Sequence, residues 1–192
     1  MILIALCLVF LLGLMAVGGR VSNLAHVELK WEWLAPLAFL MQAYLIFVPA
    51  EKWGGLLSGR SLILIFSYGL LFVVIWHNWQ LPGVKLLGLG LLLNFLVIVL
   101  NGGFMPITPE ALVRTGYDAN VSQLETGYLV GRTKNIVMEL GEARLWFLSD
   151  IVVIPKPFPI PSVLSVGDLL IVVGVFFFLR ESMSHEVPAR ST

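Results

Sequence analysis

Five long apolar stretches divide the chain and limit what it can fold into more than any other feature. Each is close to the roughly 17–25 residues that a helix needs to cross a bilayer, once flanking residues are counted. The chain has 192 residues, of which 58% are hydrophobic and 12% charged. A soluble core of this size cannot bury so much apolar surface. The sequence therefore predicts an all-α integral membrane protein in one domain, 1–192, with five transmembrane helices at about 1–18, 34–50, 61–79, 84–100 and 162–180.

Basic residues in the short connecting segments predict how these spans are oriented. The residues on the predicted inner side are Arg20, Lys30, Lys85, Arg180 and Arg190, and those in the outer short loop are Lys52 and Arg60. Lys and Arg gather on the cytoplasmic side, so this bias places the N-terminus outside and the C-terminus in the cytoplasm of a multi-pass cell-membrane protein. No basic residue precedes the first apolar run, which we therefore interpret as a retained span rather than a cleaved signal.

The segment between the last two spans, 102–161, is predicted to form an ordered insert on the outer side. Pro109 followed by residues 110–114 is typical of one helical turn. Residues 128–140 show weak helical periodicity, and residues 145–154 are apolar enough to lie at the membrane interface. A structureless loop of this length is uncommon in compact proteins. We therefore expect a partly helical insert that closes over the ends of the fourth and fifth spans.

Asp168 lies near the start of the fifth span, in the pattern Ser165-Val-Gly-Asp168. If the helix begins near Pro161, Asp168 lies about two turns inside it, where a carboxylate is costly and is a functional candidate. Alternatively, Ser165 caps the helix and Asp168 bonds back to it in a capping box. Starting there leaves about 15 apolar residues, or about 22 Å, which is short for a hydrocarbon core of about 30 Å. The sequence leaves both interpretations open.

Asp150 is the second acid of interest because its neighbours are apolar. It is either a surface acid at the interface or the partner of Asp168. Two carboxylates that share a proton keep one group neutral and one ionised, which suits general acid and base catalysis. Prolines at every second position of 155–161 favour an extended connector between the two acids. The acids can therefore meet only if this arm curls back.

Asn94 and Asn101 are seven residues apart and share one face of the fourth span. Such residues form hydrogen bonds between helices or contact a substrate, and we keep them, with Ser165, as candidate binding residues. The sequence has no metal-ligand spacing, glycine-rich phosphate loop or basic aromatic patch. We therefore expect no cofactor, no metal and no nucleic-acid partner. The predicted partners are the lipid bilayer and other membrane proteins.

Two resemblances follow from these motifs. The stretch Ser165-Val-Gly-Asp-Leu-Leu-Ile-Val-Val-Gly174, preceded by the acid in Leu148-Ser-Asp-Ile151, resembles the C-terminal region of the bacterial lipoprotein signal peptidases. That resemblance implies a catalytic dyad of Asp150 and Asp168, with Ser165 where the peptidases have asparagine. The chain as a whole, with Asn101-Gly-Gly-Phe-Met-Pro106 ahead of both acidic segments, is similar to an uncharacterised bacterial family of multi-span membrane proteins. This second resemblance implies membrane residence and no activity.

Three functions fit these patterns. The one we favour is a non-catalytic membrane protein, either an accessory subunit or a protein that binds a hydrophobic ligand. The alternative is a membrane aspartyl peptidase or hydrolase that uses Asp150 and Asp168 on a substrate delivered from the lipid. A transporter is disfavoured because no span is interrupted in its middle and five spans offer no inverted repeat. The separation of the two carboxyl groups discriminates between the first two functions.

Overall fold

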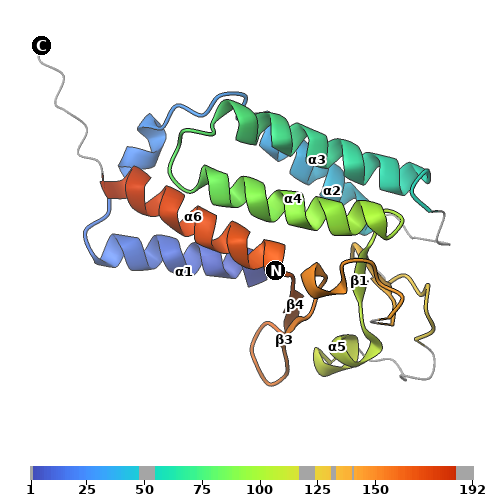
Figure 1. Cartoon of the computed structure of the whole chain (residues 1–192). Coiled ribbons are helices and arrows are strands. Elements are labelled where there is room, and N and C mark those ends of the chain that lie inside the picture. The colour runs from blue at the N-terminus through green and yellow to red at the C-terminus, as the bar shows by residue number, and fades with distance from the viewer. Residues whose placement is uncertain (1, 48–54, 117–123, 131–132, 140, 185–192) are drawn as a thin grey trace, which may run out of the picture.

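A computed structural model of the chain describes residues 2–47, 55–116, 124–130, 133–139 and 141–184. Five long helices lie alongside one another, and the described residues of 102–165, which we call the cap, lie at one end of them (Figure 1). The helices are α1 (Ile2–Ala16), α2 (Leu34–Phe47), α3 (Gly59–His77), α4 (Val84–Leu100) and α6 (Val166–Ser184). Helix α6 packs on α4 and α1, and α3 packs on α2 and α4.

Successive long helices run in alternating directions, so that their connections fall at two opposite ends. The start of α1, the end of α4 and the start of α6 lie at the cap end (Figure 1). At the far end, the Asn78 side chain donates to Lys30 O over 2.8 Å and accepts from Lys30 N over 2.9 Å. A short 3-10 helix, η1 (Val21–His26), also lies at this end, where Arg20 N donates to Met183 O. The bundle therefore has a cap end and a far end.

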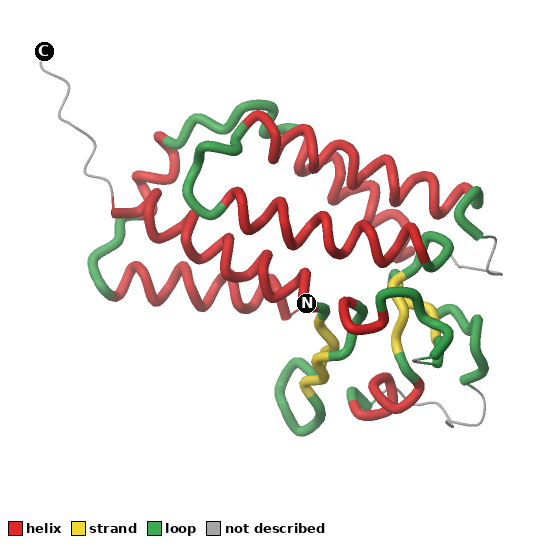
Figure 2. The backbone as a smooth tube through the Cα atoms, viewed as in Figure 1, coloured by secondary structure: helices red, strands yellow, loops and turns green. Residues whose placement is uncertain are grey.

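The cap contains two small sheets, so the all-α prediction is correct for the bundle and wrong for the cap (Figure 2). Strand β1 (Met105–Ile107) pairs in parallel with β2 (Asn135–Val137), and β3 (Val152–Ile154) pairs antiparallel with β4 (Ser162–Leu164). The helix expected over residues 128–140 is absent from the described part, where β2 lies instead. A short strand that is buried on both faces has no period of its own, which explains the error.

Two shorter elements of the cap sit where the sequence indicated order. Helix α5 (Pro109–Arg114) confirms the predicted helical turn, with Thr108 Oγ1 accepting from Ala111 N over 3.2 Å. A 3-10 turn, η3 (Trp146–Leu148), lies in the segment predicted to be interfacial. The cap has its own hydrophobic core, and a second core joins it to the bundle. The cap core is formed by Ile107, Ala111, Leu112, Leu124, Val130 and Val137, and the joining core by Leu45, Leu64, Tyr68, Val97, Ile98 and Met105.

The last long helix begins later than predicted, at Val166 rather than near residue 162, because 162–164 forms strand β4. The proline-rich segment 155–161 is the loop of the β3–β4 hairpin, so the arm does curl back. Helix α6 continues past Arg180 to Ser184, and its 19 residues span about 28 Å. The residues beyond Leu179 include Arg180 and Glu181, so the apolar part of α6 is no longer than the capping interpretation implied.

Length and composition identify one membrane-crossing candidate among the described helices, namely α3. Shorter apolar helical stretches occur at Ala5–Ala16, Leu34–Leu45 and Val84–Leu100. The chain is therefore mostly helical with small sheets, and its five spans remain a prediction. The end of the second predicted span, 48–50, lies outside the described residues, as do Lys52 and Arg190, which entered the prediction of orientation.

Candidate functional site

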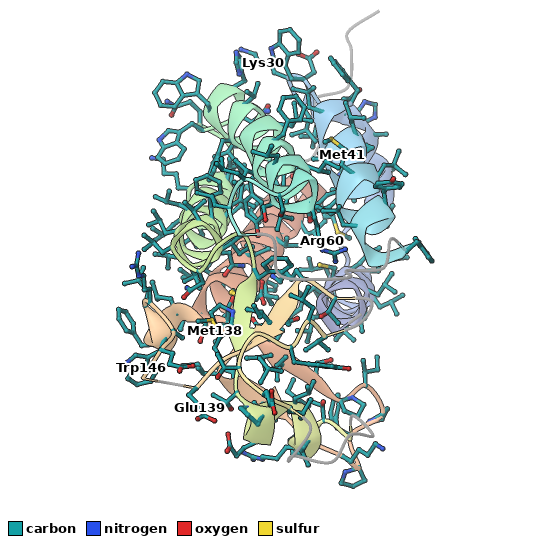
Figure 3. All side chains as sticks on the ribbon, turned by 90° about the vertical axis from the view of Figure 1, so that its right-hand side faces the viewer. Lys30, Met41, Arg60, Met138, Glu139 and Trp146 are labelled. Atoms are coloured by element: carbon teal, nitrogen blue, oxygen red, sulfur yellow. The ribbon has the colours of Figure 1, made fainter. Side chains whose placement is uncertain are left out.

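A cavity of about 330 Å³ lies where the bundle meets the cap. Its walls come from α2, α3 and α6 on one side and from the strands of the cap on the other. Figure 3 looks at the cap end and shows Arg60 of α3 next to the cap strands, with Glu139 and Trp146 at the outer edge of the cap. The charged residues that line the cavity are Arg60, Lys134, Asp150 and Asp168, and the apolar ones are Leu45, Leu64, Phe104, Val163 and Leu164.

Asp168 is held at the start of α6 by a reciprocal capping box. Ser165 N donates to Asp168 Oδ2 over 3.2 Å, and Asp168 N donates to Ser165 Oγ over 2.9 Å. The Asn94 side chain of α4 donates to Asp168 Oδ1 over 2.8 Å and accepts from Ser165 Oγ over 2.7 Å. Both carboxylate oxygens of Asp168 therefore have a partner, and the predicted capping box is present in the structure.

Asn94 reaches Asp168 because glycines bring α4 and α6 into backbone contact. A Cβ atom built on Gly90 would lie 2.4 Å from Gly167 O, and one built on Gly83 would lie 2.1 Å from Gly174 O. No residue with a side chain fits at these distances. Gly83 and Gly90 are seven residues apart in the sequence, and so are Gly167 and Gly174. This spacing returns to the same face of a helix after two turns. Our sequence analysis missed this pattern, and that spacing was the signal for it.

Asp150 is placed by the cap strands, just before β3. The Asn135 side chain of β2 donates to Asp150 Oδ2 over 2.6 Å, and Asp150 N donates to Pro106 O of β1 over 3.3 Å. The residue is only 3% exposed, yet its second oxygen, Oδ1, has no hydrogen-bond partner within the described part of the chain. A buried carboxylate oxygen without a donor is costly. Asp150 thus offers the cavity an acceptor that no described residue uses.

Charges around the cavity influence one another. Burial raises the pKa of Asp150 to about 6; Lys134 and the hydrogen bond from Asn135 act to lower it, and Asp168 adds to the rise. Burial alone would lower the pKa of Lys134, but the Coulombic effects of Tyr68, Asp168 and Asp150 outweigh it and raise that pKa. Near neutral pH, the cavity therefore holds a lysine ammonium and a carboxyl group that changes charge at mildly acidic pH.

Sequence reasoning missed the two basic residues of the site. The Arg60 guanidinium donates to Thr133 O over 2.9 Å, which connects α3 to the cap. Lys134 lies immediately before β2, between Thr133 and Asn135. The sequence analysis used Arg60 only to predict orientation and did not single out Lys134. The position of Lys134 immediately before a buried strand was the available signal.

The structure places the predicted site residues in three ways. Asp150 and Asp168, which the sequence separates by the proline arm, both line the cavity. Asn94 and Ser165 lie behind Asp168 and position it. Asn101 contacts neither acid; its side chain donates to Arg144 O and accepts from Arg144 N, each over 2.8 Å, and so ties the end of α4 to the cap.

This arrangement can bind a small molecule through both donors and acceptors. Two acids and two bases face one cavity whose remaining walls are partly apolar, as in many ligand sites. Within the described residues, no group of three or more His, Cys, Asp or Glu side chains could hold a metal ion. The expectation of no metal and no cofactor remains a prediction.

Comparisons with known proteins support the resemblance to an uncharacterised family. The family of unknown function DUF5317 matches residues 26–180. An uncharacterized protein of Thermotoga maritima is 26% identical over 185 residues, which cover 95% of each chain. No solved structure matches. The resemblance to the lipoprotein signal peptidases receives no support from these comparisons and stays a prediction.

Proposed function

The chain belongs to DUF5317, a family of unknown function, and we propose that it is a multi-pass membrane protein that binds an amphiphilic ligand beneath its cap. The protein holds this ligand without catalysing a reaction. The observation that carries the proposal is a buried acid, Asp150, with one unpaired oxygen in a cavity that also has apolar walls. An amphiphile supplies a polar group for the charged walls and an apolar chain for the others.

Exposed apolar side chains support the membrane part of the proposal. Large hydrophobic residues on the outer faces of the helices are more than half exposed, which only lipid or another apolar partner stabilises. Examples are Leu8, Val9, Leu12, Phe39, Leu40 and Phe66. Exposed aromatic residues also mark both ends of the bundle, as they do at the two faces of a bilayer. These are Trp31, Trp33, Trp76 and Trp79 at the far end and Trp146 and Phe147 in the cap.

Cysteine labelling tests the membrane orientation. The single native cysteine, Cys7, is first replaced by serine. Glu139, exposed in the cap, and Lys85, exposed at the far end, are then changed to cysteine one at a time. With the cap outside, a membrane-impermeant maleimide labels Glu139→Cys in intact cells and labels Lys85→Cys only after permeabilisation. The reverse pattern places the cap inside, and equal labelling of both in intact cells contradicts a membrane-spanning bundle.

Retention of an amphiphile tests the binding function. The protein is reconstituted in bilayer nanodiscs that hold equal parts of phosphatidylethanolamine, phosphatidylglycerol and phosphatidylcholine, and is then released for native mass spectrometry. We expect one lipid to stay with each chain. Leu45→Trp, which enlarges a side chain in the cavity wall, removes it, whereas Leu40→Trp, on the outer face of the same helix, does not. Absence of retained lipid in the wild type, or equal retention by both variants, overturns the proposal.

A second candidate function is that of an aspartyl hydrolase, because Asp150 and Asp168 line one cavity and burial raises the pKa of Asp150. In that reaction an ionised carboxylate takes a proton from the attacking water, and a protonated one gives its proton to the leaving nitrogen. Asp150→Asn and Asp168→Asn would then each abolish cleavage of a lipid-modified peptide by folded protein. If the wild type leaves that peptide intact, the binding function stands alone.

A further inference from the structure

We propose that the cavity takes a headgroup in which a primary ammonium is joined to a phosphate, as in phosphoethanolamine. This inference rests on the proposed function and names the chemical class of its ligand. It depends on two groups in the cavity wall, one an acceptor that lacks a donor and the other a donor that lacks an acceptor. They are Asp150 Oδ1 and Lys134 Nζ.

The acceptor is the more buried of the two. Asp150 Oδ2 is satisfied by Asn135, so the orientation of the carboxylate is fixed, and Oδ1 remains available. Above the pKa of Asp150, a positively charged donor binds such an oxygen more strongly than a neutral hydroxyl does, because the hydrogen bond is charge-assisted. Asp168 lines the same cavity and adds a second negative charge. An ammonium with three N–H groups meets both requirements.

The donor lies on the cap side of the cavity. Among the described residues, the Lys134 ammonium has no hydrogen-bond or ion-pair partner, although Asp150 and Asp168 are near enough to influence its pKa. Arg60 lines the same cavity. An anionic oxygen of the ligand would lie next to the Lys134 ammonium, with the Arg60 guanidinium in the same cavity wall. Phosphate suits this role because it accepts from Lys and Arg.

The balance of charge selects against simpler ligands. A purely anionic headgroup would leave Asp150 Oδ1 without a donor and would face Asp168. A purely cationic ligand would leave Lys134 without an acceptor. A quaternary ammonium carries the positive charge but has no N–H to donate to Asp150. The apolar side chains Leu45 and Leu64, which belong to α2 and α3, form an apolar wall beside the charged groups, against which the carbon chain of an amphiphile can pack.

The three-lipid nanodisc experiment tests this inference separately from the proposed function. Phosphatidylethanolamine has the ammonium and the phosphate, phosphatidylcholine lacks the N–H donors, and phosphatidylglycerol lacks the positive charge. We expect the wild type to retain phosphatidylethanolamine at least tenfold over the other two. Retention of another lipid, or of all three equally, overturns the inference while the binding function survives. Retention of none overturns both.

Two variants test whether Asp150 binds the ammonium and Lys134 binds the phosphate. Asp150→Asn should abolish the preference for phosphatidylethanolamine over phosphatidylcholine, because the charge that selects an ammonium is gone. Lys134→Met should lower retention of phosphatidylethanolamine about tenfold, since the phosphate loses its partner. If the preference is unchanged in both, the assignment is wrong. For any variant that does not fold, the wild type decides: O-phosphoethanolamine, either as the soluble compound or as the headgroup of a phospholipid, should bind better than its choline counterpart.

The soluble compound also distinguishes the source of the headgroup. If millimolar O-phosphoethanolamine binds to lipid-free protein in detergent, the headgroup alone is sufficient. If it binds only when it is part of a phospholipid, the acyl chains contribute and the ligand comes from the membrane. Both outcomes support the proposed chemistry. Failure of both the free and the lipid-borne form to bind better than its choline counterpart overturns it.

Discussion

The contact between α4 and α6 differs from the cap in how it treats a buried acid. At the helix contact, Asp168 has a partner on each oxygen, and glycines hold the two backbones together. In the cap, Asp150 is as deeply buried, but among the residues that the structure describes it has a partner on one oxygen only. Two residues of the same type on one cavity thus have different roles. Asp168 is hydrogen-bonded through both oxygens to the scaffold, whereas Asp150 keeps one oxygen without a partner among the described residues.

The comparison also shows why burial alone does not identify a functional acid. The two side chains are 5% and 3% exposed, so exposed area does not separate Asp168 from Asp150. Their hydrogen-bond partners do. A buried group that is fully paired stabilises the fold, and one that is half paired carries a free-energy penalty that a ligand can remove.

The largest effect is expected where the helices touch. A Cβ atom on Gly167 would lie 2.3 Å from Asn94 Oδ1 and 2.6 Å from Gly90 O, so Gly167→Ala forces α4 and α6 apart. We expect the free energy of unfolding to fall by about 3 kcal/mol, measured by denaturant titration in detergent. Gly69→Ala in α3, where nothing lies within 4 Å, is the control and should be neutral or slightly stabilising. Equal effects of the two variants would contradict the close contact.

The next effect is a dependence of stability on pH that originates in the cap. The pKa of Asp150 is about 6 in the folded protein against an ordinary value of 3.8, so the folded state keeps a proton that the unfolded chain has released. Wild-type stability therefore falls as the pH rises from about 4 to 6, by about 3 kcal/mol at most. Asp150→Asn has no carboxyl group to titrate at this position and so lacks this loss. The free energy of unfolding of the variant, minus that of the wild type, should therefore increase between about pH 4 and 6.

A second variant sharpens the pH experiment. Asn135→Leu deletes the hydrogen bond that lowers the pKa of Asp150. The fall in stability should then extend to higher pH than in the wild type. A difference between wild type and Asp150→Asn that stays constant from pH 4 to 7 would rule out the effect of burial on Asp150.

The third-largest effect is expected when each of the two acids is replaced by alanine. Asp168→Ala leaves the Asn94 side chain and Ser165 N without their acceptor, and should lower the free energy of unfolding by about 2 kcal/mol. Asp150→Ala leaves only the Asn135 side chain unpaired, and near pH 7 it also removes a buried charge. We expect thermal unfolding to show a smaller loss for Asp150→Ala. The opposite order would exchange the roles of the two residues.

The smallest effect is confined to the cap. Thr108→Ala deletes the side-chain acceptor at the start of α5 and should cost about 1 kcal/mol. Hydrogen exchange should become faster in α5 and unchanged in α4 and α6. Thr126→Ala removes an exposed hydrogen bond to Glu142 and is the matched control, with an expected loss below about 0.5 kcal/mol. Faster exchange in α4 after Thr108→Ala would indicate that the cap and the bundle unfold together.

Much of the bundle could be predicted because long apolar runs and helix stop signals are local. The end of α4 before Asn101 and Gly102 is one example, and Gly102 has the positive φ of 72° that such a stop requires. The strands of the cap could not be predicted in this way. Each has three residues, and the parallel pairing of β1 with β2 joins segments about thirty residues apart. The periodicity of a short segment does not indicate which distant segment it pairs with.

The candidate site was predictable in part. Asp168 and Ser165 form a motif of adjacent residues, and the alternating prolines raised the question of whether the chain turns back. Lys134, Arg60 and the unpaired oxygen of Asp150 depend on contacts between α3 and the cap. Those contacts join α3 to the segment before β2 and bring the cap strands to the bundle, and nothing within a single segment specifies them.

The direct connection between α4 and β1 has a mechanical consequence. Only residues 101–104 separate the two, and Asn101 is bonded at both ends of its amide to Arg144. Strand β1 in turn pairs with β2, which carries Asn135, and accepts a hydrogen bond from the Asp150 backbone. A change in the tilt of α4 would therefore move β1, and through β1 the Asp150 backbone and the Asn135 side chain that holds the Asp150 carboxylate.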